Sequence, residues 1–374
     1  MGLGGNSAFT RGPTAAGQLV NARIAENLAT VTACVDAVAS SMASLPPRLY
    51  RRVPGGRQEV MDHPVAALLR RPSQRQTWPD LVQWLMSQVL LHGNALAVVE
   101  HDGAGRPTGL VPVPWQNVAP MLLPSGRLAH DVVAYTSAFG GTGLPRRYLD
   151  GEVFHLRDRS DDGLLGRSRL SRAPEVLGCA LAVQEAAGAM LANGASLSGV
   201  VSVDAPLDRD TAAALREMVQ ETYGGARNTR RIGVFGHGAK FTPMSVSPED
   251  AELLASRRFT VEELARLFGV PAPIIGDLSH GTFSNSETLI RFFAQSTLTA
   301  WCTKFEAEWS RSVLGLNGAD LELELDLTGL LRGDPAQRWQ SYAIAAQHSI
   351  LDLNEIRELE GFNPRRDPAA GGAA

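Results

Sequence analysis

Two stretches in the C-terminal half of the chain place a hydrophobic residue every three or four positions, the spacing of one helix face. The first opens at Ser247, a good N-cap, with Pro248 in the first helical position. The second opens with a capping box between Ser284 and Glu287. Its hydrophobic side comprises Ile290, Phe293, Leu298, Trp301, Phe305, Trp309 and Val313. The pattern predicts two long helices, the second about 40 Å in length.

The segment between these helices is predicted to be a loop. Glycine and proline recur through it at Gly269, Pro271, Pro273, Gly276 and Gly281. They exclude regular structure for about fifteen residues, which is longer than most connections in compact domains. Two long helices joined by such a loop are unusual in a globular enzyme, and they suit an assembly that holds a loop over a channel.

The N-terminal half alternates between helical and strand-like patterns. Residues 21–44 carry a hydrophobic seam at helical spacing, which Pro46 and Pro47 end. From residue 48 to 155, short β-like runs alternate with turn signals such as Pro54-Gly55-Gly56, Asp102-Gly103 and Pro124-Ser125-Gly126. One helix lies among them, from Trp78 to Leu91, with Thr77 and Asp80 as a capping box and Gly93 as its stop. The region therefore predicts an α+β domain.

The remaining elements follow from the same patterns. Residues 171–193 predict a helix rich in glycine and alanine, and residues 200–245 predict strand, helix and strand. Leucine alternates with acidic residues from Leu321 to Leu327, as in a half-buried strand. A turn is expected at 329–333, followed by a helix over 335–348 and another that Asp352 and Glu355 cap and Gly361 ends.

Composition and charge narrow the class of protein. The 374 residues are 44% hydrophobic and carry a formal net charge of −4, with no run of basic residues longer than a pair. This charge balance argues against a protein that binds specific DNA sequences. Cys34, Cys179 and Cys302 are too far apart for a disulfide framework or a zinc site, which favours a reducing compartment. Residues 1–20 lack the hydrophobic centre of a signal peptide, and no stretch could span a membrane. Disordered tails are expected at residues 1–20 and 365–374.

Known catalytic and cofactor motifs are missing. Residues 236–240 lack the spacing of a phosphate loop, and residues 194–199 miss the register of a nucleophile elbow. Asp158, Ser160, Asp162 and Gly163 match the first half of a calcium loop, but Arg169 stands where a bidentate glutamate is needed. A turn leading into the helix after it explains this segment better. We therefore expect no catalytic residue, no cofactor and no metal.

A series of short motifs resembles the portal proteins of tailed phages of the siphovirus type. The motifs with the strongest likeness are Phe268-Gly269-Val270-Pro271, Ile275-Gly276-Asp277, Thr282-Phe283-Ser284-Asn285, and Thr297-Leu298 with Trp301. Further motifs follow the family's order, at residues 91–95, 193–195, 248–250, 330–334 and 354–357. The resemblance extends from about residue 27 to 364. The sequence departs from the family pattern at two places. The proline that commonly precedes the tryptophan at position 301 is absent, so the helix is expected to be straighter. Phe283 stands where a tyrosine is frequent.

The resemblance implies a portal fold whose parts can be assigned by residue number. Those parts are a wing (21–170), a stem helix (171–195), a small α/β clip (196–246), a second stem helix (247–268), a tunnel loop (269–284), a long helix with a wing strand (285–330) and a short helical crown (331–364).

It also implies a structural function in the particle of a phage, prophage or gene transfer agent. Twelve subunits would form a ring at one capsid vertex, assembled in the bacterial cytoplasm. The ring would dock the large terminase, contact the major capsid or scaffold protein, seat the head–tail connector and pass double-stranded DNA. The candidates to face DNA are Leu278, Ser279, His280 and Thr282, and the candidates for a clip partner surface are Arg227, Arg230 and Arg231. The alternatives are a soluble oligomeric enzyme or a terminase-associated packaging protein.

Overall fold

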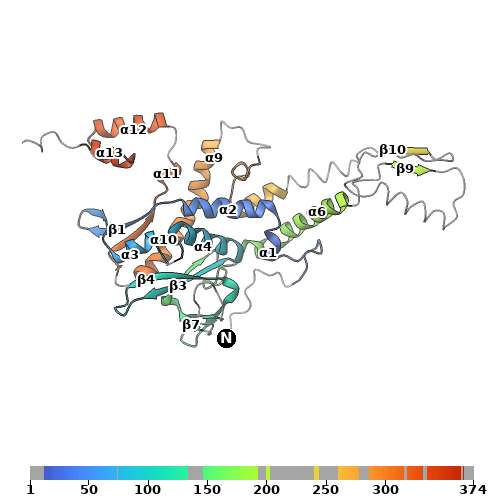
Figure 1. The fold of residues 1–374 in the computed structure, drawn as a ribbon, viewed down its shortest axis with the longest axis horizontal. Helices are drawn as coiled ribbons and strands as arrows, with labels where there is room; N and C mark the ends of the chain where they lie inside the picture. Colours follow the sequence, from blue (N-terminus) through green and yellow to red (C-terminus); the bar gives the residue numbers. More distant parts are fainter. Residues whose placement is uncertain are drawn as a thin grey trace, which may run out of the picture.

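The computed structural model describes most of the chain. The described residues are 12–73, 75–133, 146–192, 199–202, 240–243, 260–277, 286–315, 318–331, 335–363 and 365. Among them, no helix is long and hydrophobic enough to cross a lipid bilayer. Small antiparallel sheets and helices surround one main core, so the fold is α+β as predicted (Figure 1).

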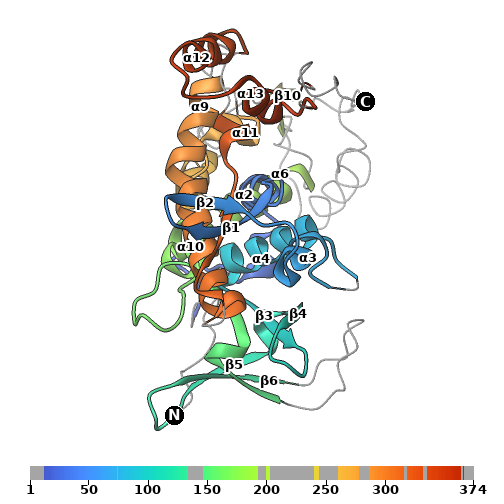
Figure 2. The same ribbon diagram turned by 90° about the vertical axis from the view of Figure 1, so that its left-hand side faces the viewer.

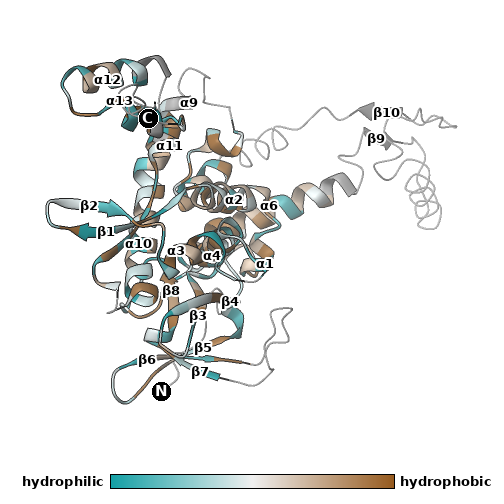
Figure 3. Ribbon diagram, turned by 60° about the vertical axis from the view of Figure 1, so that its left-hand side comes forward, coloured by the Kyte–Doolittle hydropathy of each residue, from teal (hydrophilic) through white to brown (hydrophobic). Residues whose placement is uncertain are grey.

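Two helices form the centre of the body. They are α2 (Ala29–Ala43) and α4 (Trp78–His92), which pack side by side and bury hydrophobic faces from Val31 to Met42 and from Leu81 to Leu90. Figure 3 shows the hydrophobic colouring of α4 at the middle of the molecule. The capping box of Thr77 with Asp80 is present, and Gly93 ends α4 with φ 81°, so both predictions are confirmed. The single helix predicted over 21–44 is wrong, because the chain leaves helical geometry at Leu28 and α1 (Ala22–Ala25) is separate.

Three sheets of three strands each surround these helices, and every pairing is antiparallel. The turns predicted at 54–56, 102–103 and 124–126 each join a hairpin. The strand predicted over 321–327 is present from Leu321 to Leu325 with alternating burial, and it pairs with the strand after Pro46. The sheets are, in strand order, β11 (Leu321–Leu325), β1 (Pro47–Val53) and β2 (Gly56–Glu59); β4 (Pro107–Val113), β3 (Asn94–His101) and β8 (Val153–Arg157); β5 (Val118–Leu122), β6 (Leu128–Val132) and β7 (Arg146–Leu149).

Short helices connect these sheets. Helix α3 (Pro64–Arg70) lies between β2 and α4 and was not predicted. Its N-cap is His63, whose ring nitrogen accepts the Val65 N–H, and histidine is not among the usual capping residues. Two 3₁₀ turns, η1 (Trp115–Asn117) and η2 (Asp150–Glu152), precede β5 and β8.

An arm leaves the body after β8. It begins with α5 (Arg169–Arg172), which Ser168 caps, and continues as α6 (Pro174–Ala192). The predicted start at residue 171 was therefore inexact, since the helix breaks at Ala173 before Pro174. Figure 1 shows α6 extending from the body toward β9 (Gly199–Ser202) and β10 (Lys240–Pro243), which pair antiparallel. The first of these strands was predicted, whereas β10 was not.

The predicted long helix runs over 286–314, but it is not uniformly α-helical. It consists of α9 (Ser286–Phe293), the π-helical segment η6 (Ala294–Leu298), α10 (Thr299–Trp309) and the π-helical segment η7 (Ser310–Leu314). Trp309 and Phe305 are buried and meet Trp78 with ring centroids 5.2 and 5.8 Å apart. Figure 2 shows this helix as a column along one side of the molecule.

The C-terminal part forms a small helical unit beside the end of that column. It comprises α11 (Thr328–Leu331), α12 (Pro335–Gln347) and α13 (Leu353–Leu359). The helices predicted over 335–348 and from Asp352 are confirmed, and Gly361 has φ 75° as expected of a helix stop. The turn predicted at 329–333 is wrong for its first three residues, which lie in α11.

Candidate functional site

The first of the two helices that the sequence predicts to flank a loop ends in a well-defined turn. The described helix 260–268 ends at Gly269, which adopts φ 71°. The Gly269 N–H donates to Arg266 O at 3.2 Å and the Val270 N–H donates to Ala265 O at 2.9 Å. These two bonds form a Schellman motif, in which a glycine at the position after the C-cap avoids the clash that a Cβ would cause.

The chain after this turn lies against the body. Thr297 in η6 donates its hydroxyl hydrogen bond to Gly269 O at 2.6 Å, and Val270 is buried. Residues Ala272–Ile275 form the 3₁₀ turn η4, whose isoleucines pack against the main core. Gly276 then repeats the helix-stop geometry with φ 88°. The first nine residues of the predicted loop, 269–277, are therefore attached to the core and partly regular, contrary to the expectation of irregular structure.

Arg169 joins three separate segments at this point. Its guanidinium donates to the carbonyl oxygen of Phe268 at 2.6 Å and to Asp158 Oδ2 at 2.8 Å. It also lies over the Trp301 ring, 5.6 Å from the centroid. The side chains of Arg169 and Asp158 are only 18% and 9% exposed, so this pair is shielded from solvent. We call Arg169 with Asp158, Phe268 and Trp301 the Arg169 junction.

The loop that delivers Arg169 is held by Gly93 and Asn94. The Asn94 amide donates to Gly166 O at 2.7 Å and accepts from Gly166 N at 2.8 Å, while the Asp158 N–H donates to Gly93 O at 2.9 Å. A Cβ on Gly93 would lie 2.4 Å from Ser168 N. The two backbones therefore cross too closely for any side chain at this position. This is a second reason for glycine here, in addition to the positive φ.

The calcium-loop resemblance has a structural explanation in the same segment. Asp158 pairs with Arg169, and Asp162 Oδ1 accepts the N–H groups of Leu164 and Leu165 at 2.8 and 2.9 Å. The aspartates thus fold the turn, as predicted. No cluster of three potential metal ligands occurs in the described part of the chain.

A second buried polar network fixes the far end of the long helix. Glu308 is 7% exposed, accepts the His155 N–H at 2.8 Å and pairs with Arg311 at 2.6 Å. Arg311 also donates to Asp150, in the turn before β8. The pKa of Arg311 is raised, chiefly by its hydrogen bond to Glu308. The network ties the helix to the β4-β3-β8 sheet with its charges paired.

Two buried histidine rings lie beside this network. His130 and His155 meet edge to face with centroids 4.9 Å apart, and His155 Nε2 lies 3.0 Å from Asn94 Oδ1. Burial lowers the pKa of His130 to about 4 and lowers that of His155 well below its ordinary value. Both imidazoles are therefore neutral at pH 7.

Comparison with known proteins identifies the family. A profile described as "Phage portal protein" matches residues 29–361, which is most of the chain. The chain belongs to the phage portal protein family. The resemblance drawn from the short motifs is thereby confirmed.

Individual relatives agree with this assignment. The chain is 28% identical over 344 residues to the portal protein of Enterobacteria phage HK97, covering 90% of this chain and 79% of the relative. It is 28% identical over 372 residues to the probable portal protein of Streptomyces phage phiC31, covering 96% and 80%.

Solved structures share the fold. A chain from the virion of a native gene transfer agent particle superposes with a TM-score of 0.63 at 25% identity, over 90% of this portal protein and 91% of that chain. An HK97-family portal protein from Corynebacterium diphtheriae superposes with a TM-score of 0.56 at 17% identity, over 83% and 96%.

The residues predicted to contact DNA and partners lie outside the described part of this portal protein. These residues are Leu278, Ser279, His280 and Thr282 of the loop and Arg227, Arg230 and Arg231 of the clip. The structure describes instead the base from which the loop leaves, at Asp277 and Ser286. Sequence patterns noted Arg169 only as a poor calcium ligand, because its partner Phe268 is 99 residues away.

Proposed function

We propose that this portal protein forms a ring at one vertex of a capsid and that double-stranded DNA passes through the opening. The family match over residues 29–361 carries the proposal. Two structures of the neck of a gene transfer agent particle, computed with C6 and C12 symmetry, contain chains of the same fold and are consistent with a closed ring. Twelve subunits are the number we expect. The role is structural, and we assign no chemical step to the chain.

The Arg169 junction gives the channel loop a fixed base in this proposal. Helix 260–268 and the start of the α6 arm are the two stem segments, and Arg169 holds both against Trp301 of the long helix. The loop then needs to span only residues 278–285. Its candidates Leu278, Ser279, His280 and Thr282 carry no lysine or arginine. Such a surface contacts phosphates without the counterion release that would retain DNA.

The proposed partners follow from the same assignment. The large terminase would dock at the clip, where Arg227, Arg230 and Arg231 supply positive charge. The major capsid or scaffold protein would contact the wing, and the head–tail connector would join after packaging. The site of action would be the virion, with assembly in the bacterial cytoplasm.

Ring formation is the first test. We expect multi-angle light scattering of the purified protein, and negative-stain images, to give an annulus of about twelve subunits. A monomer at every ionic strength and at high protein concentration would refute the ring.

The loop is tested separately. Deletion of residues 278–282 should leave the ring intact and impair retention of packaged DNA. Replacement of the same residues by glycine and serine keeps the length of the loop and should also leave the ring intact. Loss of the ring in both variants would show that the loop is needed for assembly rather than for DNA passage.

A further inference from the structure

Residues 12–20, within the tail expected at the N-terminus, lie against the α6 arm. The Ala15 N–H donates to Glu175 Oε2 at 2.9 Å. The side-chain amide of Gln18 donates to Glu185 Oε2 at 2.6 Å. Both carboxylates belong to α6, so the start of the chain is tied to a helix that follows it by more than 150 residues. We call residues 12–20 the N-terminal strap.

A threonine of the strap sits directly on the backbone of α6. Thr14 is 7% exposed, and a Cβ on Gly178 would lie 2.3 Å from its Oγ1 and 2.7 Å from its Cβ. Any side chain at position 178 would therefore displace the strap. Glycine destabilises a helix interior relative to alanine, which occupies many other positions of α6. The close approach of Thr14 gives a reason for the glycine at this position.

The strap is a compact turn that matches one face of α6. The Thr14 N–H donates to Gln18 O at 2.9 Å, and the Gln18 N–H donates to Thr14 Oγ1 at 3.2 Å. The partners on the helix, Glu175, Gly178 and Glu185, are spaced by three and seven residues, as on one helix face. The turn thus accompanies α6 over about 15 Å.

The strap holds α6 farther from the body than the main core does. The α6 residues in that core are Leu177, Ala180 and Leu181, in the first half of the helix. Among the described residues of α6, Glu185 is the last whose side chain bonds to another segment. Figure 1 shows α6 continuing away from the body. At the other end of the strap, Val20 is 2% exposed within the main core, so the strap connects the core to the arm.

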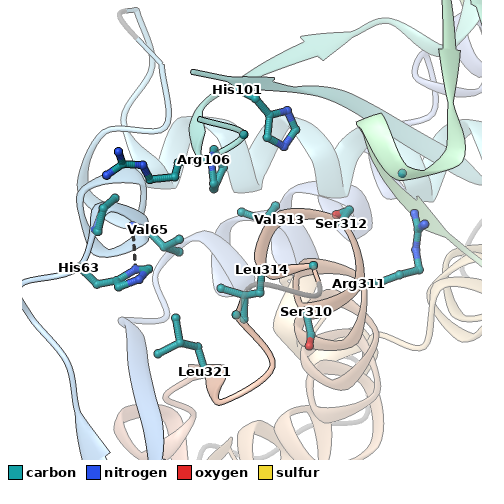
Figure 4. Close-up of a pocket in the computed structure, with 16 residues that line it drawn as sticks. His63, Val65, His101, Arg106, Ser310, Arg311, Ser312, Val313, Leu314 and Leu321 are labelled. Atoms are coloured by element: carbon teal, nitrogen blue, oxygen red, sulfur yellow. Dashed lines mark hydrogen bonds between the residues drawn. The ribbon is translucent and has the colours of Figure 1, made fainter. Parts of the chain in front are cut away.

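The strap is not a lid over the cavity that Figure 4 shows. Residues of α3, the β3–β4 hairpin and η7 line that cavity, and none of its lining residues lies in the strap. The contacts of the strap with α6 indicate instead that it acts on the arm.

We propose that the N-terminal strap sets the direction of the α6 arm through the contact of Thr14 with Gly178. With this contact made, the arm is held from Glu175 to Glu185. Without it, only the core contacts at the base remain, and a helix about 28 Å long turns about them. The strap acts within one subunit, so this proposal and ring formation fail separately. Its effect on the channel wall rests on the proposed function.

Hydrogen exchange of the full chain, followed by mass spectrometry, tests the contact. Gly178→Ala should displace the strap and accelerate exchange about tenfold or more in peptides that cover residues 12–20 and 182–189. Gly188→Ala is the matched control, since it makes the same change in the same helix and its Cβ would meet nothing within 4 Å. Alanine is the better helix former, so Gly188→Ala should slow exchange in α6 or leave it unchanged.

A second variant, Thr14→Gly, opens the contact from the side of the strap. It removes the three atoms nearest to a Cβ at Gly178, and it adds no atom that could disturb the fold. Thr14→Gly should also accelerate exchange in residues 182–189. Gly178→Ala should then have no further effect in the Thr14→Gly background, because the two changes break the same contact.

Spin labels report the direction of the arm. The labels are placed at Gln83→Cys on α4 and Ala189→Cys on α6, both exposed positions, in a Cys179→Ser background. The other two cysteines are buried and are not labelled. Double electron–electron resonance, on labelled protein diluted with unlabelled protein, should give one narrow distance distribution that Gly178→Ala broadens and Gly188→Ala leaves narrow.

Three results would overturn the proposal. They are equal exchange rates in Gly178→Ala and Gly188→Ala, unchanged exchange in Thr14→Gly, and effects of Thr14→Gly and Gly178→Ala that simply add. An equally narrow distance distribution in the Gly178→Ala protein would show that the core alone directs the arm. Circular dichroism melts identify a variant that has lost its fold, and Thr14→Gly then decides the outcome.

Discussion

Glycine residues at backbone crossings determine much of the geometry around the Arg169 junction. Gly93 combines a positive φ with a neighbouring backbone at 2.4 Å from any Cβ, and Gly269 combines a positive φ with the Thr297 hydroxyl at 3.0 Å. The sequence predicted Gly93 as a helix stop and Gly269 as the first residue of the loop, and each residue ends a helix. Their second role, close approach to another chain segment, depends on contacts far apart in sequence and has no local signal.

Gly93→Ala should destabilise the protein by about 3 kcal/mol, because the positive φ and the contact with Ser168 both oppose a side chain. The displaced loop 158–168 would also move Arg169. Urea denaturation measures the loss. Gly103→Ala is the control, since its Cβ would meet nothing within 4 Å and its φ is not positive. Equal stability of the two variants would contradict the role given to Gly93.

The buried histidines predict acid sensitivity. The pKa of His130 is about 4 when folded and 6.5 ordinarily, so above pH 6.5 neither state binds the proton. As pH falls from 6.5 to 4, the unfolded state takes up a proton that the folded state does not, and stability drops by about 3 kcal/mol. His155 adds a loss in the same direction.

Urea denaturation between pH 7 and 4 checks this expectation. His130→Phe keeps an aromatic edge against His155 and should reduce the slope of stability with pH. His348→Phe, at an exposed position, should leave the slope as it is. A slope that is the same in all three proteins would exclude His130 as its source.

At the scale of elements, the sequence predicted those helices whose ends carry standard signals. The capping boxes of α4 and α13 and the hairpin turns at 54–56, 102–103 and 124–126 were all correctly placed. The break at Leu28 was missed because that side chain is buried in phase with the next helix, so the hydrophobic spacing continues through it. The break before Pro174 had a signal, since the residue before a proline avoids helical geometry. The π-helical segments have none that spacing would reveal.

The candidate site was predictable only in part. The sequence located the loop, its two flanking helices and Trp301, but not the packing of 269–277 against the core, which depends on Thr297 and on the two isoleucines of η4. Asp158 and Arg169 are eleven residues apart and face each other because Asn94 folds the loop between them. Such contacts follow from tertiary structure and not from the local pattern.

Arg169→Met should loosen the contact of helix 260–268 and the α5–α6 arm with the long helix. It leaves Asp158 and the Phe268 carbonyl without their shielded partner, which costs about 2–3 kcal/mol. Hydrogen exchange should accelerate at the amides of Gly269 and Val270, whose bonds form the helix stop. Arg167→Met is the control: that side chain is 47% exposed and should contribute under about 1 kcal/mol. Unchanged exchange at Gly269 in the Arg169 variant would show that the junction does not hold the loop base.

At the scale of the whole molecule, the C-terminal helices form a unit apart from the main core. The core cluster extends from Val20 to Leu325 and includes none of the residues of α12 and α13 whose side chains the structure describes. These two helices are held together by Arg338 and Glu360 at 2.7 Å and by Tyr342, which donates to Glu360 at 3.1 Å. Their surface exposes large hydrophobic side chains at Trp339, Ile344, Ile350 and Leu353. A single subunit leaves this surface in water, whereas neighbours in the proposed ring would cover it.

Removal of residues 335–374 should therefore affect the ring more than the subunit. We expect the melting temperature of the subunit to stay within about 2 °C, because the buried core is intact. The truncated ring should dissociate with less added salt, or after a smaller dilution, than the full-length ring does. Light scattering measures this. The double substitution Ile344→Ser and Ile350→Ser tests the same surface in the full chain without removing the helices. If truncation lowers the melting temperature by more than about 5 °C, the C-terminal helices stabilise the subunit itself, and the exposed hydrophobic residues need another explanation.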